Sequence, residues 1–138
     1  METKRMEELY QSIANVIIET IPDEWDKIYA YAEVREGYSQ VYFYYYSINK
    51  SQLIYSLDIV DIFKVDKKMF RNLKYEMYSY FEQLWKEFKN QEQEPWTYLT
   101  FILDSNGKMK IDYGYDDVSE ISPVKKQENW KKKYFEVI

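Results

Sequence analysis

The beginning of the chain carries apolar side chains at intervals of three and four positions, the spacing that gathers them on one face of an α-helix. The positions concerned are Met6, Leu9, Tyr10, Ile13, Ala14, Val16, Ile17 and Ile21. Pro22 follows, and proline ends a helix because it has no backbone N–H and clashes with the preceding turn. We therefore expect an amphipathic helix over residues 2–21.

The apolar pattern then changes to a period of two, which is typical of β-strands. Turn residues divide this region into a three-stranded antiparallel meander, with strands expected at residues 25–35, 38–47 and 52–60. The middle strand places Phe43 and Tyr45 on one face and Tyr42 and Tyr44 on the other. A strand that is aromatic on both faces is either covered on both or presents one aromatic face to a partner.

A long second helix is expected at residues 67–90, where Asp66 can cap the first turn with its carboxylate. One face of this helix carries a continuous apolar stripe, which we expect in the core: Phe70, Leu73, Met77, Phe81, Leu84, Trp85 and Phe88. Further on, Asn106-Gly107 is a strong indication of a β-hairpin between strands at residues 96–103 and 108–115. Ser122-Pro123 then opens a short helix at residues 124–135.

The order of these elements predicts an α+β fold: helix, three-stranded antiparallel meander, long helix, β-hairpin and short C-terminal helix. With 138 residues, of which 46% are hydrophobic and 31% charged, the chain is expected to form one domain, residues 1–138. No stretch resembles a secretory signal or approaches the roughly 18 apolar residues of a membrane span, so we expect a cytoplasmic protein with no membrane contact.

The composition also restricts the chemistry. The chain has no Cys and no His, so it lacks the commonest general base, the cysteine nucleophile and the usual transition-metal ligands. We therefore expect no enzymatic activity, no metal site and no cofactor. Aromatic residues make up 20% of the chain, and tyrosine-rich surfaces are well suited to contact with a macromolecular partner.

The densest acidic segment lies just after the expected hairpin, within residues 91–120, which carry two basic and seven acidic side chains. Its candidate partner-binding residues are Asp112, Tyr113, Tyr115, Asp116, Asp117 and Glu120. The carboxylates could form an acid/base pair, although nothing in the sequence sets their separation. They could bind Ca²⁺ or Mg²⁺, although the spacing of an EF-hand loop is missing. They could also be a solvated strand end, or an anionic and aromatic patch that attracts a basic partner.

Three stretches near the C-terminus resemble a known family. They read W-T-Y-L-T-F-I-L, D-S-N-G-K-M-K-I-D-Y-G-Y-D-D and S-P-V-K-K-Q-E-N-W-K-K-K-Y, within residues 95–134. Together they closely resemble the C-terminal signature of the YezG/EsaG-like immunity family of Gram-positive bacteria, and a looser resemblance covers nearly the whole chain. The chain differs from the usual pattern at Gly114, where a polar or acidic residue is more common, and at Lys125 and Lys126, where arginine is common.

The resemblance implies an antitoxin that binds and neutralises a toxin exported by the type VII secretion system. The antitoxin is expected to bind the DNA-degrading nuclease domain of that toxin. The resemblance does not imply an enzyme, and it leaves the oligomeric state unknown. Two other functions remain open, a protein-binding adaptor and a nucleic-acid-binding protein. The second would use the basic residues of the last helix, which are Lys125, Lys126, Lys131, Lys132 and Lys133. The overall pI near 4.9 disfavours nucleic acid, and Trp130 is expected in the core of the fold.

Overall fold

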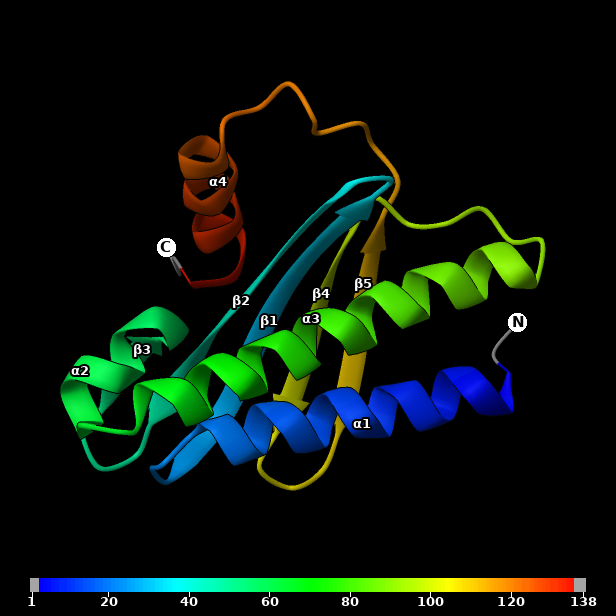
Figure 1. Ribbon diagram of the computed structural model, residues 1–138. Coiled ribbons are helices and arrows are strands. Elements are labelled where there is room, and N and C mark those ends of the chain that lie inside the picture. Colours follow the sequence, from blue (N-terminus) through cyan, green and yellow to red (C-terminus); the bar gives the residue numbers. More distant parts are fainter. Residues whose placement is uncertain (1–2, 136–138) are drawn as a thin grey trace.

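The computed structural model describes residues 3–135, and its strands form a single antiparallel sheet (Figure 1). The strand order across the sheet is β3-β2-β1-β4-β5, so the meander and the hairpin join through β1 and β4. The α+β class and the order of the major elements are confirmed. Their bounds are α1 Lys4–Thr20, β1 Trp25–Arg35, β2 Tyr38–Ser47, β3 Gln52–Tyr55, η1 Ser56–Asp58, α2 Ile59–Phe63, α3 Lys67–Asn90, β4 Tyr98–Asp104, β5 Met109–Gly114 and α4 Pro123–Phe135.

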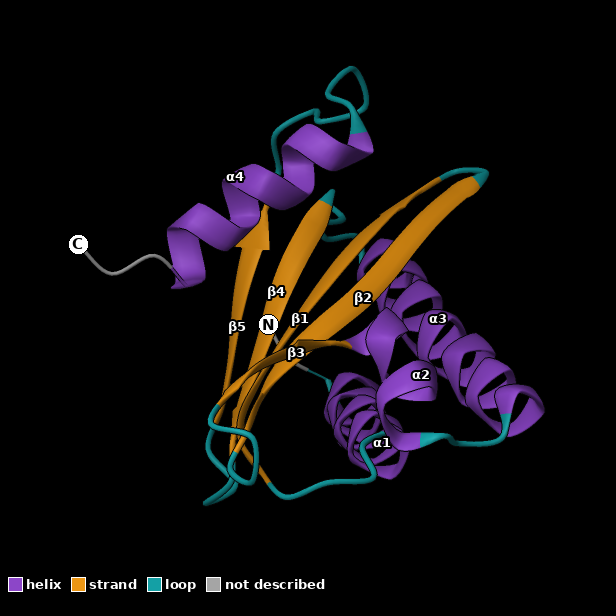
Figure 2. Ribbon diagram, turned by 90° about the vertical axis from the view of Figure 1, so that its left-hand side faces the viewer, coloured by secondary structure: helices purple, strands orange, loops and turns teal. Residues whose placement is uncertain are grey.

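The molecule has three layers. Helices α1 and α3 lie side by side on one face of the sheet, and α4 lies on the other face (Figures 1 and 2). The main core lies between the sheet and the pair of helices, where alternate residues of β1, β2 and β4 meet the stripes of α1 and α3. Within residues 3–135, no helix is long and apolar enough to cross a membrane.

Both long helices begin and bury their side chains largely as the pattern predicts. Thr3 caps α1 by accepting a hydrogen bond from the Met6 N–H, and Asp66 caps α3 by accepting one from the Lys68 N–H. All eight predicted apolar residues of the first helix are buried, as are six of the seven in the second. Phe70 is the exception, because it is only partly buried against the edge of the core. Residue 2, the expected start of the first helix, lies outside the described residues.

The expected third strand at residues 52–60 is wrong in its second half. The strand ends at Tyr55, and the chain continues as η1 and α2. Ser56 explains the change, because its hydroxyl accepts a hydrogen bond from the Phe43 N–H at 3.2 Å and so takes the place of the next ladder bond. Ile59 then turns into the core, where it is fully buried.

The hairpin between β4 and β5 forms around the predicted turn, although β4 begins two residues later than expected. Gly107 has a φ of 90°, which only glycine adopts without strain, and its N–H donates to the Asp104 carbonyl at 2.9 Å. Strand β5 forms one edge of the sheet, beside β4. The chain then crosses from this edge to the start of α4, and this crossing places the predicted acidic segment beside the last helix (Figure 1).

Candidate partner-binding surface

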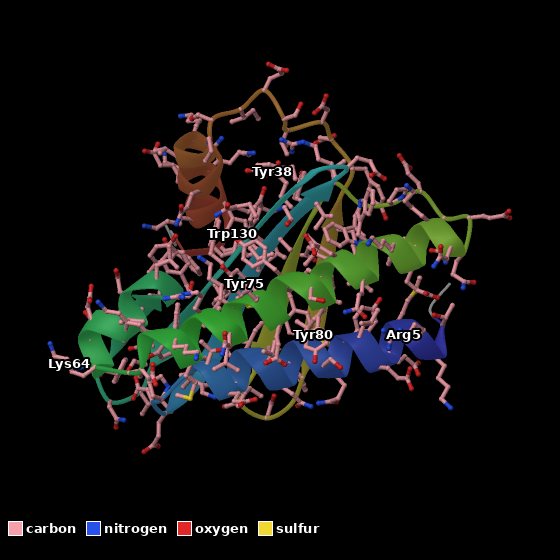
Figure 3. All side chains as sticks on the ribbon, viewed as in Figure 1. Arg5, Tyr38, Lys64, Tyr75, Tyr80 and Trp130 are labelled. Atoms are coloured by element: carbon pink, nitrogen blue, oxygen red, sulfur yellow. The ribbon has the colours of Figure 1, made fainter. Side chains whose placement is uncertain are left out.

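Helix α4 covers a sheet face that consists mainly of tyrosine. Trp130 is the buried residue of the helix, and its ring centroid lies 5.6 to 5.9 Å from those of Tyr31, Tyr42 and Tyr44. Figure 3 shows Trp130 between α4 and the strands. Its indole N–H donates to the Thr100 hydroxyl at 2.9 Å, so the polar edge of the ring is satisfied where it is buried. The aromatic strand β2 is thus covered on both faces, and the prediction that Trp130 lies in the core is confirmed.

A buried charge cluster holds the first turns of α4 against the sheet. Glu33, which is 1% exposed, accepts hydrogen bonds from Lys126 Nζ at 2.7 and 2.9 Å. It also accepts from Tyr31 Oη at 2.9 Å and pairs with the guanidinium of Arg35. Two cations therefore surround one buried carboxylate, which offsets the cost of removing that carboxylate from water. Burial, together with the charge of Glu33, raises the pKa of Tyr31 and keeps its hydroxyl protonated as a donor.

A cavity of about 330 Å³ opens between α4, the sheet and the crossing segment. Its walls are the rings of Tyr31, Tyr98, Trp130 and Tyr134. The cavity also has a polar lining, contributed by Thr100, Asp112, Asp116, Lys126, Asn129 and Lys133. Aromatic walls with a few convergent polar groups are characteristic of a binding site. We refer to this feature as the α4 cavity.

Two of the predicted acidic residues line the α4 cavity. Asp112 is half-buried on β5 and accepts a hydrogen bond from the Tyr134 hydroxyl at 2.8 Å. Burial and this bond to a carboxylate raise the pKa of Tyr134 to about 12, so the tyrosine donates at neutral pH. Asp116 is exposed, and its backbone carbonyl accepts from the Thr97 hydroxyl at 2.6 Å, which fixes the crossing segment to the start of β4.

The remaining acidic residues lie along the crossing segment. Asp117 accepts hydrogen bonds from both the hydroxyl and the backbone N–H of Ser119, and these bonds hold its pKa below the usual value. Its side chain therefore organises a local turn, as the solvated-strand-end hypothesis allows. Glu120 and Tyr115 are exposed, and Tyr115 retains 48% of its accessible surface.

Tyr113 lies on the opposite face of the sheet from Asp112. Its hydroxyl is 2.8 Å from the Tyr10 hydroxyl on α1, and its ring centroid is 5.3 Å from that of Phe88 on α3. The side chain is partly buried against the main core. Residues adjacent on a strand point to opposite faces, so the structure separates the ring of this tyrosine from the carboxylates with which the sequence grouped it, although Tyr113 is also part of the cavity lining.

Sequence reasoning missed the aromatic half of the cavity. Tyr98 and Tyr134 are far apart in the chain, and the α4 cavity brings them together. Side chains alternate between the two faces along β4, and this alternation already placed Tyr98 and Thr100 on the face away from the main core. Gly114 also has a role here, because a Cβ at this position would overlap the ring of Tyr98, its register partner on β4.

The five lysines of α4 do not act as one basic surface. Lys126 has only 9% of its side chain exposed and pairs with Glu33, beneath the helix. Lys131 lies over the ring of Tyr44 and Lys133 over that of Tyr134, each with Nζ 5.4 Å from the ring centroid. Lys125, Lys131, Lys132 and Lys133 are exposed. The ion pair with Glu33 therefore removes Lys126 from the predicted basic set, and four lysines of the helix remain at the surface.

The chain matches a known family of immunity proteins. The family model described as "Immunity protein YezG-like" matches residues 6–138. The immunity protein YezG of Bacillus spizizenii (strain ATCC 23059 / NRRL B-14472 / W23) is 40% identical over 132 residues, which cover 94% of this chain and 82% of that protein. The YezG protein of Bacillus subtilis (strain 168) is 38% identical over 130 residues, which cover 93% of this chain and 86% of the relative.

A third relative is named as a protein of a secretion system. The type VII secretion system protein EsaG of Staphylococcus aureus (strain NCTC 8325 / PS 47) is 30% identical over 137 residues, covering 98% of this chain and 84% of EsaG. The chain therefore belongs to the YezG-like immunity protein family, and the resemblance seen in its C-terminal sequence is confirmed.

Proposed function

We propose that this protein is a cytoplasmic immunity protein that neutralises a toxin of a type VII secretion system by binding the toxin's nuclease domain. Membership of the immunity family and similarity to EsaG support the class of partner. The nuclease target is suggested by the chemistry of the surface. A nuclease groove must attract phosphate and is therefore basic, and the carboxylates around the α4 cavity are complementary to it.

The observation that carries the proposal is the position of Asp112 and Asp116 at an aromatic-walled cavity. A binding surface of this kind combines ring area, which contributes affinity, with carboxylates, which contribute orientation and rapid association. The protein is proposed to act stoichiometrically and without turnover. Because the chain lacks His and Cys, inhibition by binding is also the simplest mechanism for its composition.

The test uses purified protein and the nuclease domain of the proposed cognate type VII toxin. We expect a stoichiometric complex that blocks DNA cleavage, and we expect co-expression to protect cells from the toxin. The Asp116→Asn, Asp117→Asn double variant should melt like the wild type and bind more weakly by about 2 kcal/mol, because basic groups of the partner lose their counter-charges. If the wild-type protein neither binds the domain nor protects cells, the proposed function is wrong. Binding without inhibition would favour an adaptor instead.

A further inference from the structure

Several aromatic rings line the α4 cavity, and its volume of about 330 Å³ is at the small end of the roughly 300–1,000 Å³ range of ligand pockets. Such a volume suits one long side chain. We propose that the α4 cavity receives an arginine side chain of the toxin, an inference that rests on the proposed function and names the chemical group recognised.

The walls suit a flat cation. Tyr31 and Tyr98 lie nearly parallel, at an interplanar angle of 20° and a centroid separation of 6.3 Å. Trp130 and Tyr134 contribute two more rings from α4. Because Tyr31 and Trp130 are buried, the partly exposed rings of Tyr98 and Tyr134 are the ones that an entering cation can reach. The face of an aromatic ring attracts a cation, and a guanidinium is planar enough to stack on the ring and weakly hydrated enough to leave water at low cost.

The charges around the cavity also favour a cation. Among them, the ammonium of Lys126 is already paired with the buried Glu33. Asp112 accepts the Tyr134 hydroxyl through Oδ2, and its Oδ1 lies 3.6 Å from the ammonium of Lys110, an exposed side chain that an entering guanidinium would have to displace or share. Among residues 3–135, the carboxylate of Asp116 forms no ion pair. A guanidinium can bond a carboxylate through two parallel N–H groups, which an ammonium cannot do.

One cation of the chain itself already lies against this wall. Lys133 lines the cavity and holds its ammonium 5.4 Å from the centroid of the Tyr134 ring. The side chain is exposed and can move aside. The contact shows that the aromatic wall accommodates a positive charge. Lys133 therefore allows a test of the charge of the occupant. Removing the charge of Lys133 should strengthen the binding of a cation in the cavity and weaken the binding of an anion.

The first experiment uses the protein alone, with N-acetyl-arginine amide as the probe and its neutral isostere N-acetyl-citrulline amide as the control. We expect the arginine probe at low salt to shift the NMR signal of the Trp130 indole N–H, which lies at the cavity and bonds Thr100. Asp116→Asn should weaken this response severalfold. Asp117→Asn should not, because Asp117 does not line the cavity and is engaged with Ser119. Equal responses to the two probes, or no response, would overturn the proposal.

The second experiment measures binding to the toxin's nuclease domain. Lys133→Gln should lower Kd by about threefold or more, because a competing cation is removed. The matched control is Lys131→Gln, which makes the same charge change on the same helix at a residue that lies over Tyr44, outside the cavity. Equal effects of the two variants, or weaker binding by Lys133→Gln, would overturn the arginine site while leaving the proposed function intact. Failure of the wild type to bind would instead contradict the proposed function. The probe experiment would still show whether the cavity binds a guanidinium.

Discussion

Lys126 Nζ lies 2.7 and 2.9 Å from the two carboxylate oxygens of Glu33, across a separation of 93 positions in the chain. This pair joins α4 to the central strand of the sheet at a site where Glu33 is buried and only 9% of the Lys126 side chain is exposed. Its position explains why a lysine of a seemingly solvated basic helix faces inward. The pair also fixes which side of α4 meets the sheet, and hence the shape of the α4 cavity.

Lys126→Met should lower the free energy of unfolding by about 3 kcal/mol, because breaking a buried ion pair leaves an incompletely compensated charge. Arg35 remains beside Glu33 and limits the loss. Urea unfolding measures the effect, and hydrogen exchange should show α4 losing protection first. Lys125→Met is the matched control at an exposed neighbour and should change stability by less than about 0.5 kcal/mol. Equal stability of the two variants would contradict the role of the pair.

Gly114→Ala should destabilise the protein by about 1–3 kcal/mol, because the added methyl group overlaps the ring of Tyr98. The same substitution made in a Tyr98→Ala background should cost much less, since the ring is gone. Thermal unfolding of the four proteins of this double-mutant cycle measures the coupling. If the two substitutions were additive, the contact between Gly114 and Tyr98 would not be the reason for glycine here.

Phe81→Ala and Trp85→Ala should each lower the free energy of unfolding by about 3–5 kcal/mol, because both rings are buried between α3 and the sheet. The control is Tyr75→Ala, on the same helix, where the side chain is 64% exposed and the expected change is within about 0.5 kcal/mol. Chemical denaturation distinguishes these outcomes. Wild-type stability in both core variants would mean that the stripe does not support the fold.

Stability should fall when the pH rises above 10. Burial raises the pKa of Tyr134 from 10.0 to about 12 and shifts those of Tyr31 and Tyr42 in the same direction. Because the folded state resists deprotonation, this contribution is fully present below the ordinary tyrosine pKa and is lost as pH rises from 10 toward 12. Urea unfolding at a series of pH values gives the slope of the unfolding free energy against pH, and Tyr134→Phe should make this slope shallower. A slope unchanged by Tyr134→Phe would contradict the assignment.

Association with the proposed partner, the nuclease domain of a type VII toxin, should slow as salt is added. Exposed carboxylates steer a basic partner over distances comparable with the Debye length, which is roughly 8 Å at physiological ionic strength. Stopped-flow measurement over a range of salt concentrations tests this directly. The dependence should be weaker in the Asp116→Asn, Asp117→Asn variant. An association rate that does not respond to salt would mean that these charges do not guide the encounter.

Local patterns in the sequence were sufficient for most elements. The spacing of apolar residues identified α1, α3 and the first two strands, because helix and strand periods depend only on which side chains share a face. The capping carboxylate of Asp66 and the Asn106-Gly107 turn are likewise local and were predicted. The prediction of the third strand was wrong beyond Tyr55, because Ser56 ends the ladder by accepting a hydrogen bond from the Phe43 N–H of another strand.

What only the tertiary structure decided is the composition of the candidate site. The pairing of β1 with β4 joins the meander and the hairpin into one sheet, and no local pattern specifies a partner across about 70 residues of chain. That pairing puts Tyr31 beside Tyr98, and the Glu33–Lys126 contact then lays α4 over both. The sequence by itself located the carboxylates of Asp112 and Asp116. The cavity they line exists because of long-range packing, which depends on shape and charge in three dimensions rather than on the order of residues.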